Sequence, residues 1–291
     1  MTPAARSKKP QQSEATFTDP WGVVTTYDKY LVDAPRAIVQ IAHGLGEHAG
    51  RYHHVAAALN SAGFSVYAAD GRGHGRTGVQ QAGGDLSKLG HLGEGGLRAA
   101  VANLTELTRI IRDENPGVPI VFLGHSMGSL MGQIMLNAHA DDYTAVVLSG
   151  SAYRMPGYMD AGDLNRKFAV PGGTGREWLS RDPEVWKKFN EDPWTFDAKV
   201  LPLFGLADGL RLFGTPAKDM AEVPILIIGG ERDAVGGEKS MLKLAQAYAA
   251  VGQTDVTVTV YPDARHELFN ETNKQEVFDD MIAWIMDRVA S

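Results

Sequence analysis

Short apolar segments alternate with amphipathic segments along most of this 291-residue chain. The segments with the apolar, turn-bounded pattern of buried strands are 37–42, 64–69, 119–124, 144–150 and 224–230. Several of the stretches between them have helical spacing, and the longest of these, 96–117, ends in a Pro-Gly stop. Strands that alternate with helices form a parallel sheet covered by helices on both faces. The sequence therefore predicts an α/β fold.

The alternation stops after residue 150 and resumes at residue 224. Residues 151–223 are rich in Pro, Gly, Trp and Phe and show no clear strand pattern. We expect a core made of residues 17–150 and 224–291, interrupted by a cap or lid at 151–223, called the insertion below. Residues 1–16 are polar and lack periodicity, so we expect a disordered N-terminal tail.

Composition excludes several classes of protein. The absence of cysteine removes disulfides, thiolate metal sites and a cysteine nucleophile. A formal net charge of -7 gives no basic footprint, so we expect no nucleic-acid partner. The first residues contain no apolar core of a secretory signal, and no run of about 18 apolar residues occurs anywhere. We therefore expect a cytoplasmic protein without a membrane-spanning helix.

A Gly-x-Ser-x-Gly pattern lies where an apolar strand meets a helix. It reads Gly124-His125-Ser126-Met127-Gly128. A tight reversal at this point strains the serine backbone and requires small neighbours two residues away on either side, which the two glycines provide. The ordinary structural explanation of such a short motif is a serine that caps a helix after a glycine turn. Its place between strand and helix favours Ser126 as a nucleophile.

A serine nucleophile needs a base, and a single histidine follows His139 in the chain. This histidine, His266, lies in a loop after the last strand, at the edge where a parallel sheet collects catalytic groups. Behind a nucleophile elbow the chain order is serine, acid, histidine. Asp233 follows a strand that ends in two glycines and is the preferred acid, with the role of holding the imidazole in one tautomer. Glu231 and Asp263 are the alternatives.

Two backbone amides are expected to stabilise the oxyanion of a tetrahedral intermediate. One belongs to Met127, the residue after the serine. The other belongs to Leu45, in the loop after the first buried strand, because the glycines on either side let this loop approach a substrate. His43, His48 and His74 lie in or near this loop without a metal-binding spacing, so we expect no metal and no cofactor. Their expected role is to fix the loops by hydrogen bonds.

Five segments carry a resemblance to a known family. They are HGLGEHAGRY from His43, DGRGHGRTG from Asp70, GHSMGS from Gly124, GGERDAVGG from Gly229 and ARHELFNE from Ala264. Together they resemble the monoacylglycerol lipase and lysophospholipase-like group of α/β-hydrolases, of the serine aminopeptidase S33 type. The resemblance implies an eight-stranded, mostly parallel sheet with a mainly helical cap after strand 6. It also implies a triad and an oxyanion hole; these are Ser126, Asp233 and His266, and the amides of Leu45 and Met127.

The insertion carries many aromatic and leucine side chains. Most should form a small core that packs the insertion onto the sheet, and we expect a subset to line an acyl pocket. The candidates are Trp178, Trp194, Phe196, Leu206 and Leu210. Each methylene buried there gains about 0.8 kcal/mol, so a medium acyl chain gains several kcal/mol. Residues 201–214 have helical spacing and predict a lid edge that makes peripheral contact with a membrane.

The favoured function is a serine hydrolase that cleaves carboxylic esters through an acyl-enzyme, with monoacylglycerols or lysophospholipid-type single-chain lipids as substrates. A general short-chain carboxylesterase, a thioesterase and a peptidase are the alternatives, because one triad serves all acyl transfers. Ser126 argues against enzymes of this fold that use an aspartate nucleophile. A non-catalytic binding protein is disfavoured because every triad position is filled. We expect a monomer or homodimer.

Overall fold

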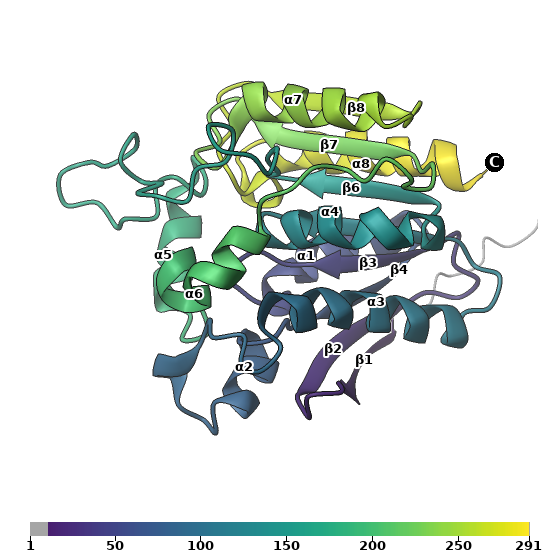
Figure 1. Cartoon of the computed structure of the whole chain (residues 1–291), viewed down its shortest axis with the longest axis horizontal. Coiled ribbons are helices and arrows are strands. Elements are labelled where there is room, and N and C mark those ends of the chain that lie inside the picture. Colours follow the sequence, from purple (N-terminus) through teal and green to yellow (C-terminus); the bar gives the residue numbers. More distant parts are fainter. Residues whose placement is uncertain (1–10, 291) are drawn as a thin grey trace, which may run out of the picture.

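An eight-stranded sheet runs through the computed structural model, which describes residues 11–290 (Figure 1). The strands are β1 (Gln11–Thr18), β2 (Val24–Leu31), β3 (Ile38–Ala42), β4 (Ser65–Ala69), β5 (Ile120–His125), β6 (Ala145–Ser149), β7 (Ile225–Gly230) and β8 (Val256–Tyr261). Their order across the sheet is β1-β2-β4-β3-β5-β6-β7-β8. β2 is antiparallel to β1 and to β4, and the other neighbouring pairs are parallel. The predicted eight-stranded, mostly parallel sheet is confirmed.

The first strand corrects the predicted disordered tail. Residues 11–16 belong to β1, which pairs with β2 along its whole length, while residues 1–10 lie outside the described part of the chain. β1 is an edge strand whose residues are mostly exposed, so it carries polar side chains and little of the alternation that predicts a half-buried strand. One of its apolar residues, Phe17, packs on the ring of Tyr27 in β2 at a centroid distance of 6.2 Å.

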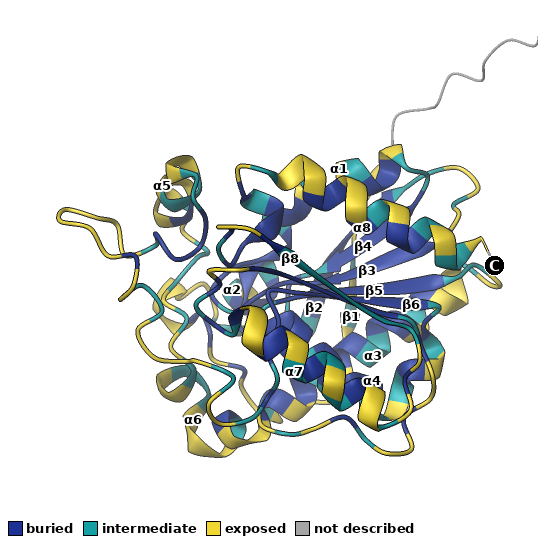
Figure 2. Ribbon diagram, turned by 90° about the horizontal axis from the view of Figure 1, so that it is seen from above, coloured by how far each residue is buried: buried dark blue, intermediate teal, exposed yellow. Residues whose placement is uncertain are grey.

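Helices cover both faces of the sheet (Figure 2). They are α1 (His53–Ser61), α2 (Gly75–Gln81), α3 (Gly96–Glu114), α4 (Met127–His139), α5 (Pro183–Glu191), α6 (Val200–Arg211), α7 (Gly237–Ala250) and α8 (Lys274–Val289), with short 3-10 helices at Ala49–Tyr52, Leu86–Lys88, Ala140–Asp142 and Leu268–Asn270. α1 and α8 pack on one face, and α3, α4 and α7 pack on the other. Within residues 11–290, no helix combines the length and the apolar composition needed to cross a bilayer.

The sheet separates two apolar cores, and β5 shows why the central strands are largely apolar. Val121 and Leu123 face the core under α1 and α8, whereas Ile120 and Phe122 face the core under α3, α4 and α7. All four are buried. A strand covered on both faces loses the alternation of polar and apolar residues, which is the pattern found in the sequence.

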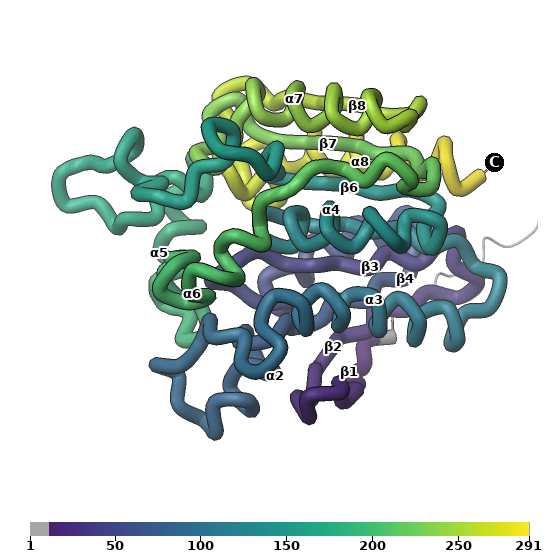
Figure 3. The backbone as a smooth tube through the Cα atoms, viewed as in Figure 1, coloured from purple at the N-terminus to yellow at the C-terminus, as the bar shows by residue number. Residues whose placement is uncertain are grey.

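The insertion leaves the sheet at the carboxyl end of β6 and returns to β7 (Figures 1 and 3). Its helices are α5, of nine residues, and α6, of twelve; the rest is turns and irregular chain. The prediction of a mainly helical cap is therefore wrong for most of the insertion. Glycine explains part of this result, because Gly205 kinks even α6 with a φ of 72°. A third apolar cluster joins insertion residues such as Trp178 and Leu212 to Met127 and Leu130 in α4.

Candidate active site

Ser126 lies at the sharp turn between β5 and α4. Its φ of 50° and ψ of -121° place it in a strained region that few non-glycine residues adopt. Its N–H donates to Ser149 O at 2.9 Å, which holds the turn against β6. A Cβ at Gly128 would lie 2.2 Å from Ala42 O, and one at Gly124 would lie 2.8 Å from Gly128 O. Only glycine fits at both positions, so the turn predicted from the motif is formed.

His266 and Asp233 meet above the ends of β8 and β7. The His266 Nδ1 atom lies 2.9 and 3.0 Å from the two carboxylate oxygens of Asp233. Because Nδ1–H donates to the carboxylate, Nε2 keeps its lone pair free, and this atom is buried without a hydrogen-bond partner among the described residues. Burial lowers the pKa of His266, but the charge and hydrogen bond of Asp233 outweigh it, so the net pKa is raised.

The two alternative acids lie elsewhere. Glu231 and Asp263 are both exposed, and the Asp263 N–H donates to Glu231 Oε2 at 3.0 Å. The Asp233 carboxylate is instead almost completely buried beside the imidazole. Of the three candidates, the geometry brings only Asp233 to His266.

Ser126 and His266 line the same cavity, of about 60 Å³. A Cβ at Gly150, at the end of β6, would lie 3.1 Å from the His266 ring, so glycine there lets the imidazole approach the sheet. Within residues 11–290, no hydrogen bond joins the Ser126 hydroxyl to His266 Nε2. Such contacts are often long before substrate binds and tighten in the reacting complex. The free Nε2 and the hydroxyl share a space into which an ester can fit.

The loop after β3 and the start of α4 each place one backbone amide at this cavity. Leu45 and Met127 both line it, and neither backbone N–H has an acceptor in the described chain. Met127 is the first residue of α4, where helical N–H groups lack intrahelical partners. Glu47 holds the loop after β3 in place. Its Oε1 atom accepts hydrogen bonds from the Gly44 N–H at 2.6 Å and from the Tyr52 hydroxyl at 2.7 Å. The arrangement can present two donors to one carbonyl oxygen.

An ion-pair network connects the Leu45 loop to the His266 loop. Arg51 donates to Glu47 and to both carboxylate oxygens of Glu267, each at 2.7 Å. Burial raises the pKa of Glu47, but Arg51 and nearby groups outweigh it and lower the pKa to about 2. The sequence analysis missed this network. The i, i+4 spacing of Glu47 and Arg51 is a usable signal, whereas Glu267 is too distant in sequence to be paired with them.

The remaining histidines of this region fix loops, as expected. His43 Nε2 accepts the Gly71 N–H at 2.9 Å, and His74 Nδ1–H donates to a backbone carbonyl at 2.8 Å. His48 bonds to Asp192 of the insertion. Across residues 11–290, no group of three or more His, Cys, Asp or Glu side chains is placed to hold a metal ion.

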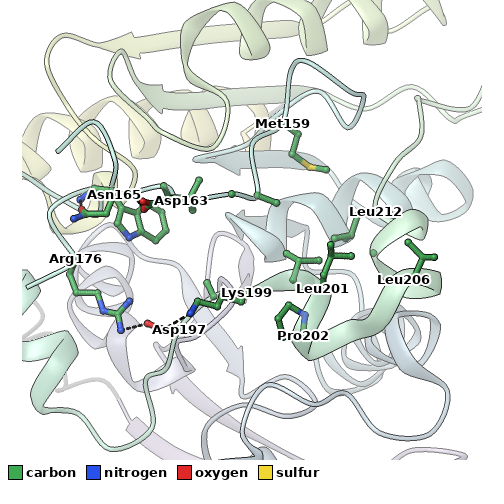
Figure 4. A pocket seen from close by; sticks show the side chains of 18 of the residues that line it. Met159, Asp163, Asn165, Arg176, Asp197, Lys199, Leu201, Pro202, Leu206 and Leu212 are labelled. Carbon is green, nitrogen blue, oxygen red and sulfur yellow. Dashed lines mark hydrogen bonds and ion pairs between the residues drawn. The ribbon is translucent and has the colours of Figure 1, made fainter. Parts of the chain in front are cut away.

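An open depression of about 1050 Å³ adjoins the small cavity. All of its lining residues belong to the insertion, and some of them, including Met159 and Leu164, also line the cavity at Ser126. Figure 4 shows leucines on one side of the depression and charged groups on the other; those labelled are Leu201, Leu206, Leu212, Arg176, Asp197 and Lys199. The cavity at Ser126 has room for only a few atoms, so a long acyl chain has to extend into the depression.

The predicted pocket residues lie at different places. Phe196 lines the cavity at Ser126, Leu206 and Leu210 line the depression, and Trp178 lines both. Trp194 lines neither space. Its ring packs edge-on against His48 at a centroid distance of 5.3 Å, so the structure does not bring this residue to the pocket.

Trp178 also contacts the imidazole itself. Its ring lies 4.9 Å from the His266 ring at an interplanar angle of 33°, and its carbonyl accepts the His266 N–H at 3.4 Å. The next carbonyl, of Leu179, accepts the Glu267 N–H at 2.7 Å. The insertion therefore holds the loop that carries His266.

Residues 33–273 match the family model described as serine aminopeptidase, S33. The chain belongs to this family. The family model spans β3 to the start of α8 and contains every candidate site residue as well as the insertion.

Relatives cover nearly the whole chain. A monoacylglycerol lipase of Mycolicibacterium smegmatis is 34% identical over 294 residues, which cover 96% of this chain and 98% of the relative. A monoglyceride lipase of Mus musculus is 26% identical and covers 88% and 84% of the two chains. Among solved structures, a thermostable carboxyl esterase from Bacillus coagulans in complex with glycerol has a TM-score of 0.84 at 26% identity, covering 96% and 99%. These α/β-hydrolases are similar to this chain over its full fold.

Proposed function

We propose that this protein hydrolyses single-chain lipid esters, of the monoacylglycerol or lysophospholipid type, through an acyl-enzyme formed on Ser126. The chain is a serine ester hydrolase by family; the residue roles and the substrate are the proposal. One observation carries the residue roles. His266 Nε2 is buried without a partner in the same cavity as Ser126, while Asp233 holds the opposite ring nitrogen.

The reaction proceeds in two acyl transfers. His266 Nε2 takes the proton of the Ser126 hydroxyl as the oxygen attacks the ester carbonyl, and Asp233 stabilises the resulting imidazolium. The Leu45 and Met127 amides donate to the developing oxyanion. The imidazolium then protonates the departing alcohol, which leaves the acyl group on the serine. Water, deprotonated by His266, attacks the acyl-enzyme and releases the carboxylic acid.

The shape and polarity of the site support a lipid ester. The space above Ser126 is narrow, and the insertion extends it into a much larger depression. Leu201, Leu206 and Leu210 line that depression and suit an acyl chain, because each buried methylene contributes about 0.8 kcal/mol. The monoacylglycerol lipase and monoglyceride lipases among the relatives agree with this substrate class. The insertion acts as the cap of the acyl site, on a core that begins with β1 at Gln11 and resumes after the insertion at residue 224.

The surface of α6 supports peripheral contact with a membrane. Leu201, Leu206 and Leu210 are 61%, 69% and 58% exposed, an unusual concentration for one short helix. They lie at the rim of the depression that is proposed to take the acyl chain. A substrate could then pass from a lipid aggregate into the site without crossing water. The protein is proposed to act in the cytoplasm, as a monomer or homodimer.

The test is a substrate series on the full-length protein. Turnover of p-nitrophenyl esters from acetate to palmitate is measured beside 1-monoacylglycerol and lysophosphatidylcholine, with Ser126→Ala as the control. We expect a medium- or long-chain optimum and a loss of several orders of magnitude in the variant. An acetate or butyrate optimum would instead support a general carboxylesterase, the second candidate, which the similarity to the Bacillus coagulans carboxyl esterase favours.

A further inference from the structure

The segment of the insertion that joins α5 to α6 lies directly against the loop that carries Leu45. The first part of this segment, residues 192–197, is called the strap. The Phe196 N–H donates to Gly46 O at 3.1 Å. Gly46 has a φ of 83°, and a Cβ there would lie 2.5 Å from Phe196 O. The strap backbone therefore approaches the residue next to Leu45 more closely than any side chain would permit.

A second contact joins the strap to the same loop through side chains. His48 Nδ1 accepts the Gly50 N–H at 3.2 Å, so the ring proton lies on Nε2, which donates to Asp192 Oδ2 at 2.8 Å. His48 is buried, and the Trp194 ring packs on it. The other Asp192 oxygen accepts the Trp194 N–H at 2.9 Å. Asp192 thus binds the strap backbone through one carboxylate oxygen and His48 of the Leu45 loop through the other.

These contacts leave Leu45 between two anchors. On the core side, Glu47 accepts the Gly44 N–H and is itself held by Arg51. On the outer side, the anchor is the strap. An amide aimed at an oxyanion contributes only if its direction is fixed before the charge develops. Neither anchor on its own fixes both neighbours of Leu45.

We propose that Asp192 is a positioning residue for the oxyanion hole: through His48 and the strap, it holds the Leu45 N–H toward the carbonyl oxygen of the substrate. The inference rests on the proposed function. It also gives the insertion a second role, because the same segment places Phe196 in the cavity at Ser126. The strap therefore couples one wall of the cavity to the direction of one oxyanion donor.

The test separates positioning from simple structural support. Asp192→Ala is compared with two controls. Asp192→Asn retains an acceptor for His48 Nε2–H. Glu191→Ala removes a neighbouring exposed acid whose side chain has no hydrogen bond or ion pair in the described structure. The readouts are kcat with p-nitrophenyl butyrate, the Kd of a non-hydrolysable 1-O-alkylglycerol, and Tm. Removing one oxyanion donor costs about 100- to 1,000-fold, so misaligning one is expected to lower kcat roughly tenfold. We expect this loss in Asp192→Ala alone, with Kd unchanged.

Wild-type kcat in Asp192→Ala would overturn the proposal. A parallel loss of kcat, binding and Tm would also overturn it, because that result describes a structural residue. If Asp192→Ala does not fold, His48→Asn tests the same contact, since its short amide can accept the Gly50 N–H but cannot reach Asp192. The outcome is separable from the proposed function, which is tested by the activity of Ser126→Ala and by the acyl-chain optimum of the unaltered protein.

Discussion

The two ring nitrogens of His266 have opposite environments, and this asymmetry defines the chemistry of the site. Nδ1 is held by a buried carboxylate, whereas Nε2 has no partner among the described residues. A buried polar atom without a hydrogen bond costs roughly 1–3 kcal/mol, so its retention calls for an explanation. In the proposed mechanism, the proton of the Ser126 hydroxyl supplies the missing partner.

Asp233→Asn should lower kcat by about 10⁴, because an amide cannot hold the imidazole in the tautomer that leaves Nε2 free. The measurement is steady-state turnover of the best p-nitrophenyl ester. Glu231→Gln is the matched control, since this exposed carboxylate bonds only to the Asp263 backbone in the described structure. A mild loss in Asp233→Asn combined with a large loss in Glu231→Gln would transfer the role to Glu231.

Activity should decline as the medium becomes acidic. His266 acts as a base only when it is neutral, and Asp233 raises its pKa above the ordinary value of about 6.5. Protonation therefore begins at a higher pH than for a free histidine, and kcat/KM should fall below that point with a slope of one proton. Burial lowers the pKa of neighbouring His125 to about 4, so that ring stays neutral throughout. A flat profile from pH 8 to 5 would contradict a histidine base.

The order of Asp233 and His266 along the chain, and their positions after strand ends, were enough to predict that they lie together. Asp233 and His266 follow neighbouring parallel strands, β7 and β8, whose carboxyl ends meet at one edge. The contact of Asp192 with His48 could not be predicted in this way. It joins an irregular segment of the insertion to a loop 144 residues away, and no periodic pattern encodes such a pairing.

At the scale of elements, the turn from β5 to α4 is the most demanding feature of the fold. It stores the strain of Ser126 and is held by close packing against the end of β3. Patterns of apolar residues predicted the two elements well because both are buried. They did not predict α2, whose first residues belong to the glycine-rich segment DGRGHGRTG. Glycine is a poor helix former, yet Asp70 accepts the Arg76 N–H at 3.0 Å and so holds the first turn of α2.

Gly128→Ala should destabilise the protein by roughly 2–3 kcal/mol, because the new methyl group would overlap the backbone carbonyl of Ala42 and force β3 or α4 to move. Urea unfolding measures this change. The matched control is Gly209→Ala in α6, where the nearest atom is a flexible Leu201 side-chain carbon at 3.2 Å. Gly209→Ala should leave the free energy of unfolding unchanged or raise it slightly. Equal stabilities of the two variants would show that the elbow tolerates a side chain.

At the scale of the whole molecule, the insertion contributes three structural features that the sheet alone does not provide. It walls the cavity at Ser126, it holds the His266 loop through Trp178, and it carries the most exposed leucines among the described residues. The core carries the candidate triad, and the insertion lines much of the space around it. Its sequence reveals the apolar content but not the direction in which each side chain points, which is why Trp194 was assigned to the pocket and Leu201 was not.

The exposed leucines of α6 should bind the protein to lipid. Transferring a leucine side chain from water to an apolar phase gains about 1.5–3 kcal/mol, so two such residues dominate a weak interfacial contact. The double variant Leu206→Ser/Leu210→Ser should lose most of its co-flotation with phosphatidylcholine vesicles. Leu242→Ser is the control, because Leu242 is also exposed, at 45%, but lies on α7, which is well separated from α6 in Figure 1. Equal flotation of both variants, or none by the unaltered protein, would remove the membrane from the proposed route of substrate entry.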